Sequence, residues 1–183
     1  RGWKGKTEED ILKDFKDPVA PWADLFNTSE TAVRRDPLAI DLDGDGLETV
    51  STINGAYFDH DNNGFAERTG WVSGDDGLLV MDRDNDGVIE DGTELFGDQT
   101  ILKTGKTASD GFEALAEWDD NKDGKIDSND AVWSKLKIWQ DADGDGYSSS
   151  SELFTLDEAG ITAINLGSVT TNTSSGNGNT ITQ

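Results

Sequence analysis

Cysteine is absent from this sequence of 183 residues, and histidine occurs once, as His60. The chain therefore forms no disulfide bonds and builds neither a thiolate site nor a histidine-rich zinc site. Basic residues are also scarce, with 15 Lys and Arg against 38 Asp and Glu, for a formal net charge of −23. Because such a chain repels polyanions, we expect no nucleic-acid partner. Divalent cations held by oxygen ligands are its natural counter-charge.

Long apolar segments are missing too. Hydrophobic residues make up 33% of the chain, and no run reaches the roughly 18 apolar residues that a membrane span requires. We therefore expect a modest core, a fold that needs support beyond apolar burial, and no membrane insertion by this part of the protein. Methionine occurs once, which argues against a calmodulin-type sensor with its Met-rich groove.

Residues 1–36 differ from the rest of the chain in composition and in hydrophobic pattern. They carry seven of the 15 Lys and Arg residues, a short helical pattern from Thr7 to Phe15, and proline breaks at Pro18 and Pro21. The start of the chain has no signal-peptide pattern, so we expect a part of a longer protein. We predict a leader segment, residues 1–36, followed by a module, residues 37–183, that is truncated and continues beyond Gln183.

Five acidic loops follow one another within this module. They begin at Asp41, Asp59, Asp82, Asp119 and Asp141. An EF-hand calcium loop needs oxygen ligands at positions 1, 3, 5, 7, 9 and 12, with Gly at position 6 for the sharp turn. The loops share the first half of this spacing and form a degenerate internal repeat. The repeat predicts a calcium-binding protein whose folding is linked to three to five ions.

The last two loops fit the EF-hand pattern best. The predicted ligands of one are Asp141, Asp143, Asp145, the Tyr147 carbonyl, Ser149 directly or through water, and bidentate Glu152. Those of the other are Asp119, Asn121, Asp123, the Lys125 carbonyl, Asp127 and Asp130. Only the shorter Asp130 departs from the pattern, which we expect to lower the coordination number or the affinity. The alternative is that these loops are acidic surface turns.

The other three loops are incomplete. The third loop supplies Asp82, Asp84, Asp86 and the Val88 carbonyl, but its closing acid, Glu94, falls one residue late, so we predict an expanded loop. The first two lack helical flanks and an acid at position 12, which predicts half-sites between strands that complete one another or, alternatively, plain acidic turns. Their candidate ligands are Asp41, Asp43 and Asp45 in the first loop and Asp59, Asp61 and Asn63 in the second.

The hydrophobic patterning predicts an α+β fold. Apolar runs at 38–42, 56–58 and 77–81 indicate short strands, so the N-terminal half should consist of strands and loops. Apolar residues at helical spacing predict helices over 109–118, 128–139 and 150–159, the last ended by Gly160. The C-terminal half should therefore contain EF-hand-like helices, with one helix leaving the Asp119 loop and leading into the Asp141 loop. We expect the calcium sites to organise the whole fold.

Several short segments of the module resemble the self-processing module of FrpC-type RTX proteins. The resemblance covers about residues 36–183 and rests on Asp36-Pro-Leu-Ala-Ile-Asp-Leu-Asp-Gly-Asp-Gly-Leu-Glu-Thr-Val, Phe58-Asp-His, Thr69-Gly-Trp-Val-Ser, Asp76-Gly-Leu-Leu-Val, Glu94-Leu-Phe-Gly-Asp, Trp139-Gln-Asp, Leu156-Asp-Glu-Ala-Gly-Ile and Gly176-Asn-Gly-Asn-Thr. It implies calcium-triggered, single-turnover cleavage of the Asp36–Pro37 bond. The new Asp36 end then joins a lysine amine of the same or a neighbouring protein.

The resemblance also implies a location. It implies that the protein is a toxin or an adhesin of a Gram-negative bacterium, and that it is secreted or displayed on the cell surface through a type I secretion system. A runner-up interpretation in the same setting is a calcium-stiffened structural module that never cuts itself. A third, a hydrolase acting on other proteins, would need a substrate cleft and a second catalytic group, and the sequence contains no such constellation.

The cleavage chemistry can be argued from two residues, Asp36 and Pro37. The Asp36 carboxylate can attack its own backbone carbonyl and close a five-membered anhydride. Proline makes the bond the weak point, because twisting its tertiary amide out of plane removes resonance and makes the nitrogen basic. Folding of the nearby Asp41 loop is the predicted source of that twist. The alternative is that Asp-Pro is an ordinary turn or linker dipeptide.

Three further features of the sequence bear on this chemistry. Asp17–Pro18 is the same dipeptide without an adjacent calcium loop, so we predict that it stays intact. His60 is either the group that protonates the leaving nitrogen or a hydrogen-bonded bystander. Leader lysines are possible acceptors of the new aspartyl end, and nothing selects one of Lys4, Lys6, Lys13 and Lys16.

Overall fold

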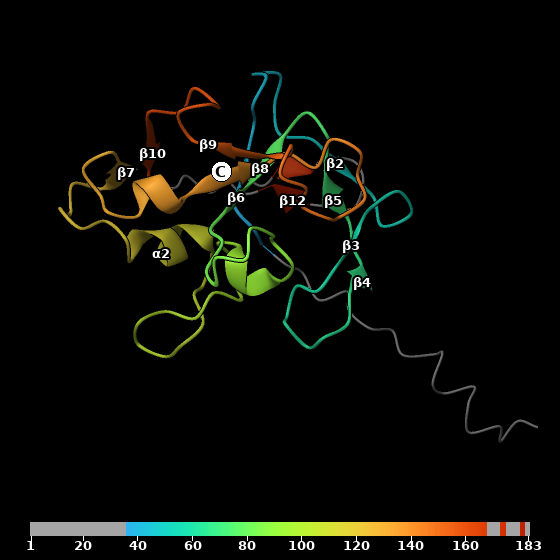
Figure 1. Ribbon diagram of the computed structural model, residues 1–183, viewed down its shortest axis with the longest axis horizontal. Helices are drawn as coiled ribbons and strands as arrows, with labels where there is room; N and C mark the ends of the chain where they lie inside the picture. The colour runs from blue at the N-terminus through green and yellow to red at the C-terminus, as the bar shows by residue number, and fades with distance from the viewer. Residues whose placement is uncertain (1–35, 168–172, 175–179, 182–183) are drawn as a thin grey trace, which may run out of the picture. The chain divides into compact units, whose positions relative to one another are not determined.

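A four-stranded antiparallel sheet forms the centre of the described part of the chain, as Figure 1 shows. The computed structural model describes residues 36–167, 173–174 and 180–181. The strands run in the order β1 (Ala39–Ile40), β6 (Gly77–Val80), β8 (Lys137–Trp139) and β9 (Leu153–Thr155). The sheet thus joins segments that are far apart in the sequence.

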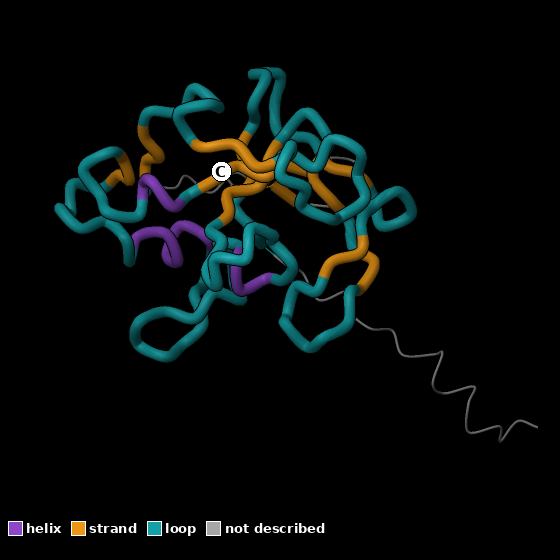
Figure 2. Tube along the Cα trace, viewed as in Figure 1, coloured by secondary structure: helices purple, strands orange, loops and turns teal. Residues whose placement is uncertain are grey.

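The remaining strands form two-stranded pairs, all antiparallel. These pairs are β2 (Thr49–Val50) with β5 (Trp71–Val72), β3 (Tyr57–Phe58) with β4 (Glu67–Arg68), β7 (Lys125–Asp127) with β10 (Ala163–Asn165), and β11 (Thr173–Ser174) with β12 (Thr180–Ile181). Helical structure in the described residues consists of η1 (Gly92–Glu94), α2 (Gly111–Ala116) and η2 (Trp133–Lys135). Loops connect these short elements and make up most of the trace in Figure 2. The fold is mainly β.

Two apolar clusters pack against the central sheet. Successive side chains of a strand point to opposite faces, and β6 accordingly places Leu79 in one cluster and Leu78 and Val80 in the other. Strand β8 divides in the same way, with Ile138 in the first cluster and Trp139 in the second. The two central strands are therefore buried on both faces.

The predicted α+β class is wrong, because the C-terminal EF-hand-like helices do not form. Residues 128–139 contain the single turn η2 and then strand β8, and residues 150–159 contain β9 followed by turns. In each segment three residues pair with the sheet, β8 with both β6 and β9, and Ile138 and Trp139 of β8 are fully buried by this pairing. These pairings supply backbone hydrogen bonds and burial that outweigh a weak helical propensity.

The three predicted strands and the first predicted helix of the module are present in shorter form. Strands β1, β3 and β6 lie within the runs 38–42, 56–58 and 77–81. Helix α2 lies within 109–118, where the Asp110 carboxylate caps it by accepting the Glu113 N–H at 2.8 Å. The Glu113 carboxylate in turn accepts the Ser109 N–H at 2.7 Å. Together these two bonds satisfy the N–H of Glu113 and of the residue before the N-cap, and they fix where the helix begins.

The predicted leader segment, apart from Asp36, falls outside the described residues, as do parts of the module after Gly167. Among the described residues, none of the helices has the length and apolar character needed to cross a membrane.

Candidate calcium loops and the Asp36–Pro37 bond

Four of the five acidic loops continue directly from strands. The loops beginning at Asp41, Asp59, Asp82 and Asp141 follow β1, β3, β6 and β8, whereas the loop beginning at Asp119 follows α2 and leads into β7. The candidate sites are therefore strand–loop units, and the helix–loop–helix arrangement expected for the last two loops is absent from this part of the structure. Three of the four parent strands, β1, β6 and β8, belong to the central sheet.

Each loop is shaped by the carboxylate of its first Asp. In the first loop, the Asp41 carboxylate accepts the Gly44 N–H at 2.8 Å and the Gly46 N–H at 3.0 Å. The same bond from the sixth-residue Gly recurs at 2.7–3.0 Å in the loops of Asp59, Asp82, Asp119 and Asp141. All five of these glycines have positive φ, which explains why a residue without Cβ stands there.

The side chains at positions 3 and 5 are aimed into the loops as well. Side-chain oxygens at position 5 accept the N–H of position 7 at Val88, Lys125 and Tyr147, at 2.8, 3.2 and 2.7 Å. In the Asp119 loop the position-3 side chain of Asn121 accepts the Asp123 N–H at 2.9 Å. The residues predicted as ligands therefore sit in matching conformations in loops of different sequence.

In four loops one oxygen from each of three acids lies within 4.8 Å of the others. The four sets are Asp41, Asp43 and Asp45; Asp59, Asp61 and Glu67; Asp82, Asp84 and Asp86; and Asp141, Asp143 and Glu152. Glu67, at position 9 of its loop, was not among the predicted ligands. Each set belongs to one loop. The acids of the Asp41 and Asp59 loops therefore form two separate groups and do not combine into one site.

The Asp119 loop is arranged differently. The Lys125 ammonium forms an ion pair with Asp127 and lies 3.6 Å from the Asp123 carboxylate. Hydrogen bonding to Asp127 raises the pKa of Lys125, and the same bond lowers the pKa of Asp127. A lysine cation thus neutralises the acids that a metal ion would otherwise share.

Two closing acids take the same place in their loops. The Asp130 carboxylate accepts the N–H of loop position 2, Asp120, at 2.9 Å and that of position 9, Asp127, at 3.0 Å. Glu94 accepts the N–H of positions 2 and 9 of its own loop, Arg83 and Glu90, both at 3.0 Å. Glu94 therefore stands where a position-12 acid stands, although it comes one residue later, as expected for an expanded loop.

Asp76 plays the corresponding part for the Asp41 loop and was missed in the sequence. Its carboxylate accepts the Leu42 N–H at 3.3 Å and the Glu48 N–H at 2.7 Å, so it spans positions 2 and 8 of that loop. Only 1% of Asp76 is exposed. Because it is 34 residues from Leu42 in the sequence, no spacing rule for a continuous loop could have found it.

Hydrogen bonds join the Asp82 loop to two of the other loops. The Ser148 hydroxyl accepts the Ile89 N–H at 2.6 Å and donates to the Ile89 carbonyl at 3.2 Å, which links the eighth residues of two loops. The Gly92 N–H donates to the Asp59 carbonyl at 2.8 Å, which ties the second loop to the third. A conformational change in one of these loops should therefore alter the position of the loop bonded to it.

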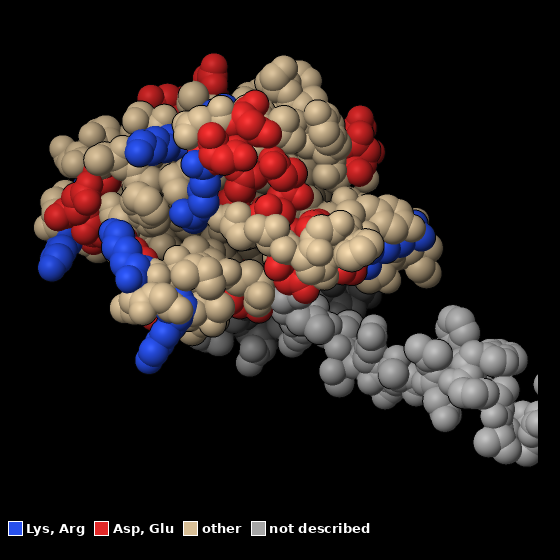
Figure 3. All heavy atoms as spheres, turned by 60° about the horizontal axis from the view of Figure 1, so that its bottom comes forward, with Lys and Arg blue, Asp and Glu red and all other residues tan. Residues whose placement is uncertain are grey.

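Burial and neighbouring carboxylates raise the pKa values of several acids in or beside the loops. A hydrogen bond with Asp43 and the negative charges of Asp43 and Glu48 raise the pKa of Asp45 to about 6. Burial raises the pKa of Glu94 to about 7 and also raises those of Asp76 and Asp141. Figure 3 shows Asp and Glu side chains gathered in the middle of one face. The raised pKa values mean that the ionised forms of these acids are disfavoured in the absence of a counter-charge, so the loops favour a hard divalent ion with oxygen ligands.

The Asp36–Pro37 bond lies against the segment that comes after Glu94. The Leu38 N–H donates to the Phe96 carbonyl at 2.8 Å, and the Leu38 carbonyl accepts the Leu79 N–H at 2.9 Å. These bonds fix the chain immediately after Pro37. Gly97 is buried and so close to the Asp36 carbonyl that a Cβ there would lie 2.6 Å from its oxygen.

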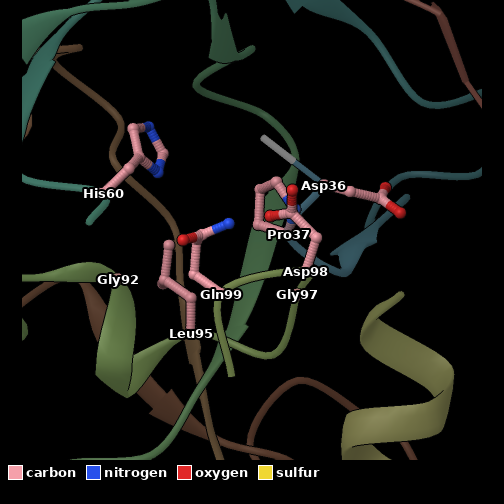
Figure 4. Close-up of a pocket in the computed structure, with 8 residues that line it drawn as sticks. All are labelled: Asp36, Pro37, His60, Gly92, Leu95, Gly97, Asp98 and Gln99. Atoms are coloured by element: carbon pink, nitrogen blue, oxygen red, sulfur yellow. The ribbon is translucent and has the colours of Figure 1, made fainter. Parts of the chain in front are cut away.

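A small pocket opens beside this bond (Figure 4). Its volume of about 10 Å³ is room for about one water molecule. Its lining consists of Asp36, Pro37, His60, Gly92, Leu95, Gly97, Asp98 and Gln99. His60 is 7% exposed and packs edge-on against Phe58 at 5.1 Å between ring centroids. In Figure 4 the Asp36 side chain points away from His60, so the sequence-based role of His60 as a proton donor stays a prediction.

Comparison with known proteins identifies similar sequences. The SPM domain matches residues 38–183. The iron-regulated protein FrpA of Neisseria meningitidis serogroup C is 47% identical over 178 residues. The similarity covers 96% of this chain but 16% of FrpA, so the chain spans less than a fifth of that relative.

Proposed function

The chain belongs to the SPM domain family, and we propose that it is a calcium-dependent module that cleaves its own Asp36–Pro37 bond. The observation that carries the proposal is the place of this bond. It lies against Gly97, three residues after the closing acid Glu94 of the Asp82 loop. The SPM match supports the same boundary, because it begins at Leu38, one residue after Pro37.

The acids of the loops fit calcium. Their donors are all oxygen, three acids converge in each of four loops, and burial or like charge raises the pKa of Asp45 and Glu94. When bound, calcium would neutralise these carboxylates and favour the folded arrangement of the loops. The residues that would hold it are the four convergent sets and the closing acid Glu94. In the Asp119 loop, calcium would have to displace the Lys125 ammonium from Asp123 and Asp127 before the predicted ligands, Asp130 included, could bind it.

The reaction itself needs only atoms of the chain and one acceptor. The Asp36 side-chain carboxylate attacks the Asp36 carbonyl carbon, the bond to the Pro37 nitrogen breaks, and that nitrogen takes a proton and leaves as a secondary amine. The product is a five-membered anhydride on Asp36. Water opens it to two carboxyl groups, whereas a lysine amine opens it to an amide and one carboxylate. Because the cleaved bond is part of the module itself, each molecule reacts only once.

Two rigid contacts can strain the bond. Leu38 is held by Phe96 and Leu79 at 2.8 and 2.9 Å, so the chain after Pro37 cannot follow a movement of Asp36. If folding rotates the chain before the bond, at Asp36, the rotation would twist the Asp36–Pro37 amide out of plane and weaken its resonance. The Asp82 loop bears on this bond directly through Glu94–Gly97. The Asp41 loop, which the sequence favoured, bears on it through β1.

One gel tests the proposal. Calcium added to the purified full chain at neutral pH should yield fragments 1–36 and 37–183 together with heavier, lysine-linked species, while Asp17–Pro18 stays intact. Asp36→Ala should abolish both reactions, because it removes the nucleophile. Samples must not be heated in acid, which hydrolyses Asp-Pro bonds without any fold. An uncut wild-type chain that has folded with calcium would reject cleavage.

The second candidate is a calcium-stiffened structural module without cleavage activity. The links among the Asp59, Asp82 and Asp141 loops favour it, since they would order the chain whether or not the bond breaks. Folding by calcium with no cut would identify this role. In either case we propose that the chain is part of a secreted or surface-displayed bacterial protein of the RTX type, exported through a type I system. The similarity to an iron-regulated FrpA protein supports this placement.

A further inference from the structure

We infer that the turn Gly97–Thr100 positions the carbonyl of the Asp36–Pro37 bond for attack, with Gly97 as the residue in contact with it. This inference rests on the proposed cleavage function and deepens it, because it assigns positioning residues at the same bond. Neither Gly97 nor Thr100 offers a catalytic group. Their part would be to hold the backbone of the bond in one orientation.

Gly97 leaves no space for a side chain on the side that faces the bond. A Cβ at this position would lie 2.6 Å from the Asp36 carbonyl oxygen, 3.0 Å from the carbonyl carbon and 3.3 Å from the Pro37 Cα. These are backbone atoms, so they cannot rotate away as the end of a side chain would. Gly97 is not among the residues with positive φ. Its lack of a Cβ therefore serves the close approach to the bond and not a turn conformation.

Thr100 holds Gly97 in place. Its hydroxyl accepts the Gly97 N–H at 3.0 Å and donates to the Leu95 carbonyl at 3.0 Å. The Thr100 N–H donates to the Gly97 carbonyl at 3.0 Å, and Thr100 is 4% exposed. Three bonds on one buried residue fix the turn, and loss of the hydroxyl would leave a buried N–H without its acceptor.

The other side of the bond has little freedom to yield. Leu38, one residue beyond Pro37, is bonded to both Phe96 and Leu79. A methyl group at Gly97 would therefore displace the Asp36 carbonyl more than the chain after Pro37. Such a shift changes the angle at which the Asp36 carboxylate meets its carbonyl carbon. Misplacement of reacting atoms by about 1 Å lowers rates about 100-fold.

The experiment compares cleavage rates of full-length variants at saturating calcium. Gly97→Ala should cut about 100-fold more slowly than wild type, with an unchanged calcium midpoint for folding, measured by tryptophan fluorescence in an Asp36→Ala background. Gly167→Ala is the matched control, because Gly167 is exposed and a Cβ there would meet no atom within 4 Å; it should cut like wild type. A Gly97→Ala rate within about twofold of wild type overturns the inference and leaves the proposed function standing.

A second pair of variants covers failure of Gly97→Ala to fold. Thr100→Val keeps the shape of the side chain but removes the hydroxyl, whereas Thr100→Ser keeps the hydroxyl. Slow cutting by the valine variant with a normal rate in the serine variant supports positioning. Equal rates in both overturn it, as does a loss of cutting that always accompanies loss of the calcium-induced fold. A wild-type chain that folds but does not cut overturns the proposed function and this inference together.

Discussion

At the scale of single residues, Asp76 shows that a carboxylate distant in sequence can close a loop. It holds the N–H groups of Leu42 and Glu48, as Asp130 and Glu94 hold those of their own loops. The candidate ligands at positions 1, 3 and 5 of every loop, acids or Asn, could be predicted because they are fixed by local spacing. Glu67 also stands at a ligand position, position 9, so spacing could have identified it. Asp76 could not be predicted, because the tertiary fold brings it to its loop.

Asp76→Asn should weaken calcium binding at the Asp41 loop by roughly tenfold, as removal of supporting residues around metal sites commonly does. The amide keeps the size of the side chain but loses the charge and one of the two acceptor oxygens. Calcium titration with one resolved step per site would measure the change. Asp75→Asn removes the same charge from the exposed neighbouring residue, and equal effects of the two variants would contradict a specific role for Asp76.

Glu94 gives calcium binding a pH dependence. In the folded chain before calcium binds, burial raises its pKa from 4.5 to about 7, so protonation of Glu94 favours this folded state and that stability is lost as pH rises from about 4.5 towards 7. Calcium must displace this proton. Apparent affinity should therefore rise with pH between about 4.5 and 7 and then level off. Titrations across this window would measure it, and Glu94→Gln should reduce the dependence to the part that comes from Asp45 and the other acids of raised pKa.

At the scale of elements, the strands were predictable and the last two helices were not. Apolar runs at β1, β3 and β6 are short and continuous, which is the pattern of buried strands. Within 128–139 the apolar residues have helical spacing, yet Val132 and Leu136 enter one cluster and Trp139 enters the other. A spacing of three to four residues can thus arise from a turn followed by a strand between two cores.

The contact between the Asp82 and Asp141 loops should contribute measurably to stability. Ser148→Ala removes the hydroxyl that bonds both the N–H and the carbonyl of Ile89, in a place where Ser148 is 1% exposed. We expect a loss of about 1–3 kcal/mol in the free energy of unfolding. Urea denaturation in calcium would measure it in an Asp36→Ala background. The exposed Ser150→Ala is the control, and an equally small change in both would show that the link is dispensable.

At the scale of the whole molecule, negative charge and a modest core oppose folding without cations. The formal net charge is −23, and the acids concentrate in loops that are joined to one another. Chelation of calcium should therefore expand the chain cooperatively, because the loops lose their shared counter-charge together. The hydrodynamic radius and tryptophan fluorescence report this, since Trp71 and Trp139 are 4% and 0% exposed.

Magnesium and sodium chloride are the controls for this expansion. Magnesium prefers a tight octahedral shell and retains its waters, so at the same concentration it should restore compaction poorly. Sodium chloride tests screening alone. An unchanged radius after chelation, or full compaction by salt, would contradict a fold that depends on calcium.

The anchoring of Leu38 affects the fate of the two chain ends after a cut. Because Leu38 stays bonded to Phe96 and to Leu79 of β6, the new amino terminus of Pro37 would remain docked beside the place where the bond was broken. The freshly made anhydride would then face a captive secondary amine before it meets water or lysine. Re-formation of the Asp36–Pro37 bond would compete with departure of the upstream chain. The yield of cut product would therefore depend on how fast the upstream chain diffuses away. Slower departure, as with a bulky protein fused upstream, should lower the yield of cut product, and gels of matched fusions would show it.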